Sequence, residues 1–310
     1  MSDYIYERVT PDHYPLLKEL YLDAFNSKID VSEIQKRFDT SELGCKHIGF
    51  IAIIPDSKKI AAYYGVFPVK IKIRDEIIQS AQSGDTMTHS LHRGKGLFVK
   101  LANLTYNECR KNGIRLIFGQ PNRYSFHGLV NSLKWKHLDN LCSWDLKLRI
   151  KTFPLPKLMR IFKANKPYLQ YAKRVMKRKQ IQISSSFDNT LSTDHGKVVR
   201  DKSYLEYKKS PDKFFIKMEG VIIWIRLTDV LWIGDFSSYE VNPGFIKSLK
   251  RLAYWLGYNT IRFNLNESIP LPAALKSFEC KSLEASCFLY LDQTLSGKNL
   301  TLTGADFDTW

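Results

Sequence analysis

The chain has 310 residues, which is enough for about two domains. With 44% hydrophobic, 13% aromatic and 25% charged residues, it has the composition of a globular protein, and a disordered or collagen-like chain is excluded. The 47 Lys and Arg against 31 Asp and Glu give a net charge of +16, which admits nucleic acid, an anionic membrane or a phosphorylated ligand as partner and selects none of them.

The amino terminus and the cysteines predict a cytoplasmic protein. No basic stretch with an apolar one behind it opens the sequence, and uncharged apolar runs such as 48–54 are too short to span a bilayer. An odd number of scattered cysteines without a CxxC pair predicts reduced core thiols. They are Cys45, Cys109, Cys142, Cys280 and Cys287. No residues stand at the spacing of metal ligands, so we expect no metal.

The first half of the chain predicts short strands and helices in a mixed order. In chain order the expected elements are a strand at 4–8, an amphipathic helix near 14–25, strands at 48–54, 60–69 and 77–88, a helix from 97 that Gly113 ends, a strand at 114–118, a helix at 126–134 and a hairpin at 135–150. Turn residues at 55–58 join the second and third of these strands as a hairpin.

The second half repeats this order of elements. Lys134–Leu138 has a counterpart in Glu279–Leu283, and a helix near 245–256 precedes a short strand at 260–262. The order of elements carries the repeat more than residue identity does. We therefore interpret 1–150 and 201–310 as two similar halves, with a linker at 151–200.

The segment between the halves is strongly basic. Residues 147–179 hold twelve Lys and Arg and no Asp or Glu, and without them the net charge is +4. A solvated linker helix is one interpretation. Because apolar residues stand beside the basic ones, peripheral contact with an anionic membrane is a second. Nucleic-acid binding is the third and weakest, since no recognised module accompanies the charge.

A glycine-rich turn follows the strand at 77–88. Arg93-Gly94-Lys95-Gly96-Leu97 opens a helix, where backbone N–H groups, the helix N-terminus and two cationic side chains converge as in a pyrophosphate cradle. A Walker A loop is excluded, because His89 stands where glycine is required. The dinucleotide fingerprint fails because Val99 replaces its third glycine. The alternative is a turn that merely caps a surface helix.

With its flanking segments, this turn resembles that of the GNAT acyl-CoA-dependent N-acyltransferases, which reads Arg/Gln-x-x-Gly-x-Gly/Ala. The upstream Thr86–His89 and the downstream Phe118–Ser125 are also similar to the family, whereas Phe98 stands where Gly or Ala is usual. The resemblance covers about 4–150 and extends loosely to the second half. It implies an α/β (α+β) fold of tandem GNAT-like halves, each a mixed, mostly antiparallel sheet flanked by helices.

The resemblance also implies acyl-CoA as co-substrate, with its pantetheine arm between two diverging strands. Met87 and Thr88 would offer backbone groups to the pantetheine, and an N–H near Met87 would polarise the thioester carbonyl. Asn122 and Ser125 would contact the pantetheine near the thiol. The residues expected to hold CoA are Met87, Thr88, Arg93, Gly94, Lys95, Gly96, Leu97, Phe98, Asn122 and Ser125.

The catalytic residues are less well marked. Members of the family often protonate the leaving thiolate with a helix tyrosine, whose place is taken here by Val130. Tyr124 and Ser125 are the nearby substitutes. The candidates for a general base are His89, His127 and Asp85. Each of these could instead be an ordinary surface or turn residue, and a bound water could carry the proton.

The second half lacks the cradle, because Glu240–Pro243 stand at the equivalent turn. We therefore expect one acyl-CoA site, in the first half, with the degenerate second half contributing to the acceptor pocket. The motif combination looks most like tandem-GNAT enzymes of bacterial surface-polysaccharide pathways, some of which acylate a nucleotide-linked (dTDP- or UDP-type) amino-deoxysugar. The alternatives are a protein, peptide or other small-molecule amine as acceptor, or a non-catalytic module that binds membranes or nucleic acid.

Overall fold

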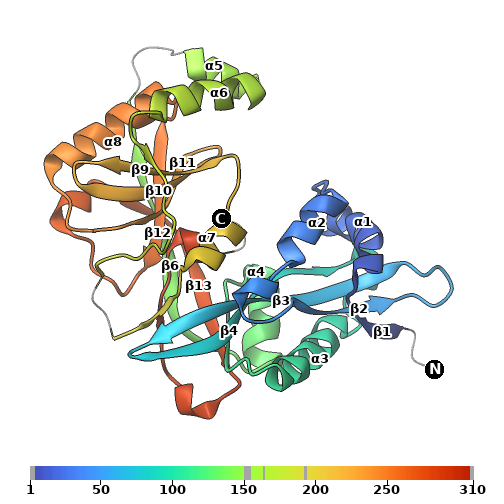
Figure 1. Ribbon diagram of the computed structural model, residues 1–310. Coiled ribbons are helices and arrows are strands. Elements are labelled where there is room, and N and C mark those ends of the chain that lie inside the picture. Colours follow the sequence, from blue (N-terminus) through green and yellow to red (C-terminus); the bar gives the residue numbers. More distant parts are fainter. Residues whose placement is uncertain (1–3, 150–154, 163–164, 192–193, 308–310) are drawn as a thin grey trace. The chain divides into compact units, whose positions relative to one another are not determined.

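The computed structural model describes residues 4–149, 155–162, 165–191 and 194–307 and separates into two compact units (Figure 1). Unit 1 takes residues 1–138, 195–199 and 285–299. Unit 2 takes 139–194, 200–284 and 300–310. Neither unit is one uninterrupted stretch of chain, so each is completed by segments from distant parts of the sequence.

Unit 1 contains a mixed, mostly antiparallel sheet, which confirms the expected fold class. Its strands follow one another in the order β1 (Ile5–Arg8), β2 (Ile48–Ile53), β3 (Ile60–Ile73), β4 (Glu76–Thr88), β5 (Leu116–Gly119) and the last residues of β13 (Glu279–Tyr290), with β8 (Gly196–Val198) beside β3. Only the β4–β5 pair is parallel among these neighbours.

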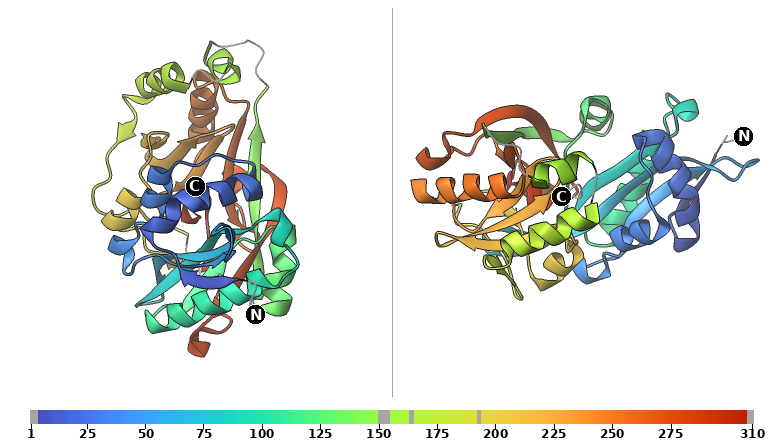
Figure 2. Two further views of the ribbon diagram at one scale, coloured as in Figure 1. Left: turned by 90° about the vertical axis from the view of Figure 1, so that its right-hand side faces the viewer. Right: turned by 90° about the horizontal axis from the view of Figure 1, so that it is seen from above.

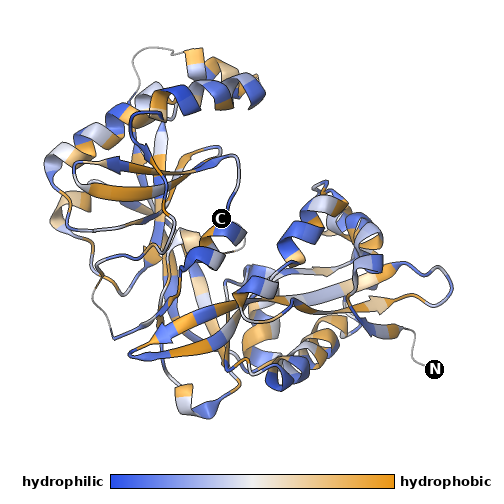
Figure 3. Ribbon diagram, viewed as in Figure 1, coloured by the Kyte–Doolittle hydropathy of each residue, from blue (hydrophilic) through white to orange (hydrophobic). Residues whose placement is uncertain are grey.

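Helices cover both faces of this sheet. The helix α3 (Leu97–Lys111) lies on one face, and α1 (Tyr14–Phe25) and α2 (Val31–Phe38) lie on the other (Figures 1 and 2). Figure 3 shows hydrophobic and hydrophilic residues alternating along α3, and its buried Leu97, Leu101 and Cys109 pack against the sheet. After β5 come the short α4 (Arg123–His127) and a π-helical turn, Gly128–Ser132.

Unit 2 repeats much of this order. Its strands run β6 (Lys136–Lys147), β12 (Thr260–Asn266), β11 (Leu231–Phe236), β10 (Val221–Leu227), β9 (Lys213–Met218) and β7 (Gln180–Ile181), and its helices are α5 (Leu155–Ile161), α6 (Asn165–Met176), α7 (Lys202–Tyr207) and α8 (Pro243–Trp255). The short β14 (Leu300–Thr301) follows β13. The parallel pair here is β11–β12, joined through α8.

The hairpin expected at 135–150 is wrong. Residues 136–147 form the single strand β6, which pairs antiparallel with β12 from Leu141 opposite Asn266 to Lys147 opposite Thr260. The corresponding partner of β5 in unit 1 is β13. A local sequence pattern cannot reveal a partner strand more than a hundred residues away. For this reason the sequence suggested a local turn. Ile150, the last residue of the expected hairpin, lies outside the described residues.

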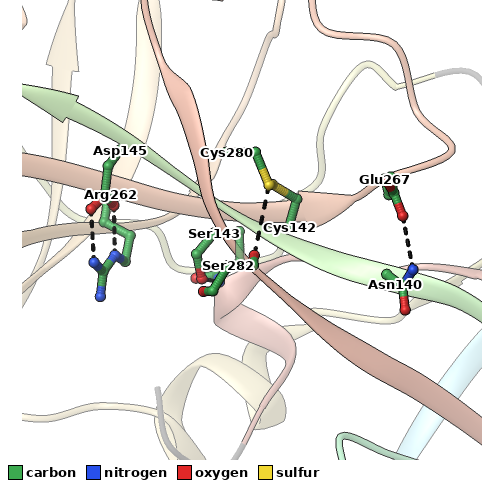
Figure 4. Close-up of a disulfide and its surroundings, with 9 residues drawn as sticks. Asn140, Cys142, Ser143, Asp145, Arg262, Glu267, Cys280 and Ser282 are labelled. Carbon is green, nitrogen blue, oxygen red and sulfur yellow. Dashed lines mark hydrogen bonds and ion pairs between the residues drawn. A yellow bond between two sulfur atoms is a disulfide. The ribbon is translucent and has the colours of Figure 1, made fainter.

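The expectation of five reduced thiols is also wrong for one pair. Cys142 on β6 and Cys280 on β13, 138 residues apart in sequence, form a disulfide within unit 2 (Figure 4). Cys45, Cys109 and Cys287 are free. Figure 4 also shows the Asp145–Arg262 ion pair that joins β6 to β12. Within the described ranges, no helix combines the length and apolarity needed to cross a membrane.

Candidate functional site

The strands β4 and β5 part in the middle of unit 1. They pair only through Ser80–Gln82 of β4 and Leu116–Phe118 of β5. Beyond Gln82, β4 continues to Thr88 beside β3 alone. An unpaired strand edge presents free N–H and C=O groups to which another extended chain can bind. The parted strands therefore offer a place for an extended ligand that carries amide groups.

A β-bulge interrupts β4 in this unpaired part. The pairing register shifts between Tyr63 and Gly65, so that Asp85 and Thr86 face the single Tyr64, and Asp85 has a φ of 52°. The Asp85 carboxylate accepts a hydrogen bond from Arg37 Nη2 at 2.9 Å and another from the Tyr21 hydroxyl. Those partners lie on α2 and α1, so Asp85 faces the opposite side of the sheet from α3.

The glycine turn lies at the end of β4. Gly94 and Gly96 have φ values of 75° and 72°, a region that favours glycine, and a Cβ added to either would meet nothing within 4 Å. The space before the turn is therefore open. The first N–H groups of α3 point into it, since the first turn of a helix leaves them without partners inside the helix. Arg93 and Lys95 are exposed there, so the turn has the geometry and charge to bind a phosphate.

Asp23 of α1 anchors the segment before the turn. Its carboxylate accepts hydrogen bonds from Ser90 N at 2.7 Å and Ser90 Oγ at 2.8 Å. Burial opposes the charge of Asp23, but the bonds from Ser90, helped by His89 and Arg93, outweigh it and lower the pKa of this carboxyl. The carboxylate is thus a fixed anchor for the chain that enters the turn.

Two histidines stand at the base of the turn. His89 Nδ1 accepts from Leu91 N at 3.3 Å, and its Nε2 lies 3.7 Å from Asp23. His92 Nδ1 lies 2.7 Å from the Tyr4 hydroxyl, and burial, together with Lys95 and His89, lowers its pKa. A cavity of about 270 Å³ lies beside both rings. Its lining includes Leu16, Leu20, Ile60, His89, Leu91 and His92.

The residues expected on α4 follow the end of β5. Asn122 caps this helix, accepting from Tyr124 N at 2.9 Å and Ser125 N at 3.0 Å, so its side-chain oxygen is already engaged. Tyr124 is 76% exposed and lies beneath the Arg123 guanidinium. His127 is exposed at the helix end. Because β4 and β5 are parallel, their carboxyl ends lie at the same side of the sheet. The glycine turn follows the end of β4 there, and α4 follows the end of β5.

Sequence reasoning missed a buried polar chain on the α3 side of β4. The hydroxyls of Tyr64 and Tyr106 lie 2.8 Å apart, Ser83 Oγ lies 3.0 Å from Tyr64, and Trp135 Nε1 donates to Tyr106 at 3.0 Å. Burial raises the pKa of both tyrosines. The four residues come from separate segments, so no local motif could have revealed them. Among the described residues, no cluster of three or more metal-ligating side chains is found.

Comparison with known proteins finds a family model that matches this part of the chain. Residues 6–130 match the model of the acetyltransferase (GNAT) domain. A protein from Enterococcus faecalis V583, described as a conserved protein of unknown function and a probable N-acyltransferase, superposes with a TM-score of 0.61 at 12% identity, covering 94% of this chain and 73% of that one. A search of curated proteins found no match.

Two further solved structures share the fold. GCN5-related N-acetyltransferases from Kribbella flavida and Anabaena variabilis ATCC 29413 superpose with TM-scores of 0.56 and 0.54 at 10% and 11% identity. They are covered over 72% and 75% of their length, and this chain over 94% and 95%. The family match falls on the part of unit 1 that holds the parted strands and the glycine turn, so this part of the chain is similar to the acetyltransferase (GNAT) domain.

Proposed function

We propose that the chain transfers an acyl group from acyl-CoA to a primary amine, with one CoA site in unit 1. The observation that carries the proposal is the position of two features near the carboxyl ends of the parallel strands β4 and β5. The unpaired edge beyond Gln82 suits the pantetheine amides, and the open turn at 93–97 suits the pyrophosphate. Met87, Thr88, Asn122 and Ser125 remain the proposed neighbours of the pantetheine, and Phe98 remains a proposed residue of the CoA site.

The reaction is a direct attack on the thioester. The neutral amine nitrogen adds to the carbonyl carbon, the C–N bond forms, the C–S bond breaks and CoA leaves as thiolate while the amine loses a proton. A backbone N–H at the bulge near Met87 would stabilise the oxyanion. Among the proposed bases, the carboxylate of Asp85 is already bonded to Arg37 and Tyr21. His89 is favoured over His127, because it follows β4 directly and lines a cavity.

For the acceptor we propose a nucleotide-linked amino-deoxysugar of dTDP or UDP type, as in bacterial surface-polysaccharide pathways. The support is the sequence resemblance and the basic character of the chain, since cationic side chains bind a pyrophosphate through charge-assisted hydrogen bonds. A protein, peptide or other small-molecule amine is the alternative. A polyamine fits poorly, because a protein of net charge +16 repels a polycation.

Two measurements test the proposal in turn. Calorimetry with CoA and acetyl-CoA comes first, and no binding at millimolar concentration would refute the acyltransferase and leave a non-catalytic module. A thiol-release assay then pairs several acyl-CoAs with a panel of amino-sugar nucleotides and a lysine peptide. Turnover of a sugar nucleotide supports the proposed acceptor, whereas turnover of the peptide alone replaces it.

The basic segment 147–179 is proposed to contact an anionic membrane surface. Its helix α6 exposes Lys166, Lys173 and Arg174, and at the end of α5 Phe162 is 77% exposed. Two of the twelve basic residues, Lys151 and Lys163, lie outside the described residues. Co-sedimentation with phosphatidylglycerol vesicles but not with phosphatidylcholine vesicles would support the contact. If the protein sedimented with neither kind of vesicle, α5 and α6 would be interpreted as a solvated linker.

A further inference from the structure

The helices α5 and α6 of unit 2 pack against the chain segment that follows α8 (Figure 1). The Tyr168 hydroxyl of α6 donates to the Leu256 carbonyl at 3.0 Å. A Cβ added to Gly257 would lie 2.6 Å from Lys157 N, so a side chain there would collide with the first turn of α5. Glycine at this position therefore lets α5 approach closely, and these contacts hold both helices in place within unit 2.

A cavity of about 760 Å³ lies between these helices and the nearby ends of β10 and β12. Its lining includes the apolar Ile161, Leu169 and Leu227. Lys157 and Arg160 also line it, and they share one face of α5 because they stand three residues apart. A cavity of this size is large enough for a drug-sized ligand. Its apolar wall beside two cations suits a molecule that is anionic at one end and apolar at the other.

Arg160 is held in the cavity wall by uncharged groups. Its Nη1 donates to the Gly257 carbonyl at 2.8 Å, and its Nη2 donates to the carbonyls of Thr228 and Asp229. The guanidinium carbon lies 3.7 Å from the centre of the Tyr258 ring. Among the described residues, no carboxylate pairs with this guanidinium, and its Nε–H and one Nη1–H take part in none of these bonds. Arg160 therefore presents a fixed positive charge with N–H groups left for an anion.

The two carboxyl groups that line the cavity do not cancel this charge. Asp212 is already paired with Arg226 Nε at 2.8 Å. Asp229 is exposed, and the charge of Lys157 offsets it. The positive charge of Arg160 is left over, so the lining as a whole favours an anionic ligand.

Exposed apolar side chains lie beside the cavity. Leu155 at the start of α5, Ile161 at its end and the following Phe162 are all more than half exposed, and Ile161 also lines the cavity. The basic segment that contains them holds twelve Lys and Arg and no Asp or Glu. Apolar side chains among cationic ones are typical of protein surfaces that enter the headgroup region of an anionic bilayer. These exposed groups therefore favour a lipid over a small soluble anion as the ligand.

We propose that this cavity of unit 2 binds the phosphate and glycerol of an anionic phospholipid. The inference rests on the proposed membrane contact of the basic segment and adds a specific site to it. The phosphate accepts hydrogen bonds from Arg160 and Lys157. The first methylene groups of the acyl chains pack against Ile161, Leu169 and Leu227. This site is separate from the glycine turn, which belongs to unit 1.

A short-chain lipid tests the cavity without a membrane. Dihexanoyl phosphatidylglycerol, used below the concentration at which it forms micelles, is titrated into the full-length protein by calorimetry, and one lipid should bind per chain. Lys157→Gln is expected to weaken this binding about tenfold, because a hydrogen bond to a charged phosphate is lost. Lys173→Gln is the matched control, since it removes the same charge from an exposed position on α6 that is not part of the lining. The control should bind within about twofold of wild type.

A second variant reduces the cavity without changing any charge. Leu169→Trp places an indole where the acyl chains are proposed to lie and should weaken binding of the short-chain lipid at least about tenfold. Arg160 is kept in every variant, because three backbone carbonyls depend on it. Unchanged thermal unfolding shows that a variant is folded, and if Leu169→Trp is not, the comparison of the two lysine variants still decides.

The membrane contact and the cavity site fail in different ways. If the protein sediments with no phosphatidylglycerol vesicles, the membrane contact fails. If it sediments with them but does not bind the short-chain lipid, or if Lys157→Gln and Lys173→Gln bind that lipid equally well, the contact is a diffuse attraction of charges and the cavity site is overturned. Binding of inorganic phosphate as tight as that of the lipid would also overturn the inference, because the apolar wall would then contribute nothing.

Discussion

The two units contain the same strand–helix–strand arrangement with different contents. In unit 1, β4 pairs in parallel with β5 through Ser80–Gln82 and then leaves it, and α3 joins the two strands. In unit 2, β11 pairs with β12 through Leu231–Ile233 and continues to Phe236, with α8 as the connection. In both units the first strand thus runs on past its parallel partner.

In unit 2, side chains of the protein itself occupy the space beside the continuation of β11. The guanidinium of Arg200, 6% exposed, bonds to Asp235 at the end of β11 and, at 2.8 Å, to Asp306. The helix that follows is closed as well, because Asn242 caps it with a bond from Phe245 N at 2.8 Å and Pro243 supplies no N–H. Unit 1 has an open glycine turn at this place. The comparison teaches that the backbone arrangement alone does not make an anion site, and that side chains decide whether it is open or filled.

The largest effect, a loss of unfolding free energy, is expected from removing Arg200, the side chain that fills this space in unit 2. Burial opposes the charge of Arg200, but Asp306 and Asp235 outweigh it and raise its pKa, whereas burial raises the pKa of the Asp306 carboxyl. Arg200→Met would leave two fully buried carboxylates without their counter-ion and is expected to cost about 3–5 kcal/mol of unfolding free energy. Denaturant unfolding, followed by a probe within unit 2, measures the loss.

Arg226→Met is the control for this variant. Arg226 pairs with Asp212 at 2.8 Å, but both side chains are more than a quarter exposed, at 27% and 29%. Its removal is expected to cost only about 1 kcal/mol. Equal losses in the two variants would show that the buried ion pairs contribute no more than a surface pair, and the interpretation of unit 2 as a filled site would be wrong.

The next effect concerns the open turn of unit 1. Gly96→Glu puts a carboxylate where the pyrophosphate is proposed to lie and should weaken CoA binding at least about a hundredfold, which is about 2.7 kcal/mol. Gly113→Glu is a matched control, because Gly113 also has a φ of 72° and open space before its Cβ but lies at the other end of α3. Calorimetry should find the control within about threefold of wild type. Equal loss in both would point to backbone strain and place the pyrophosphate elsewhere.

Local patterns predicted the elements of unit 1 well. The strand and helix near 77–88 and 97–112 follow from alternating and helical spacing, and the glycine turn between them follows from its composition. The mixed, mostly antiparallel sheet flanked by helices was expected from the resemblance. These features depend on residues close together in sequence, which is why sequence reasoning reaches them.

Features that join distant segments were not predicted. The pairing of β6 with β12, the disulfide between Cys142 and Cys280 and the partners of Asp85 all depend on contacts that no local spacing encodes. For Asp85, the sequence alone leaves a catalytic base and an ordinary turn residue as alternatives. The chain from Trp135 to Ser83 gave no signal at all, because its members are ordinary aromatic and small polar residues until the fold brings them together.

A smaller effect is expected from the anchor of the open turn. Asp23→Ala removes both bonds to Ser90 and should loosen the chain before the turn, which weakens CoA binding about five- to tenfold, as for the loss of a helix cap. Asp30→Ala is the control, since Asp30 lies before α2 and its side chain is 87% exposed. The same calorimetric titration measures both. If Asp23→Ala bound CoA as tightly as the control, the turn would be preformed without its anchor.

The smallest effect is a pH dependence at His92. Because burial, Lys95 and His89 lower its pKa, His92 is neutral near pH 7 and gains charge only below the usual histidine value of about 6.5. In the free protein, the stability that this residue contributes is present above that unfolded-state value and is lost as the pH falls through the lowered folded-state pKa. A bound pyrophosphate reverses the preference, since it favours the imidazolium. The contribution of His92 to CoA affinity should therefore increase as the pH falls.

The ligand's own titration has to be removed from this measurement, because a phosphate monoester also takes up a proton near pH 6. The ratio of wild-type to His92→Gln affinity cancels that contribution, since both proteins bind the same CoA. Between about pH 7.5 and 5.5 the ratio should grow about two- to fivefold. His13→Gln, at a histidine bonded to Thr10 near the start of the chain, should give a flat ratio. A ratio for His92 that is equally flat would place its ring beyond the reach of the phosphates, and the positive charge of the turn would then rest on Arg93 and Lys95 alone.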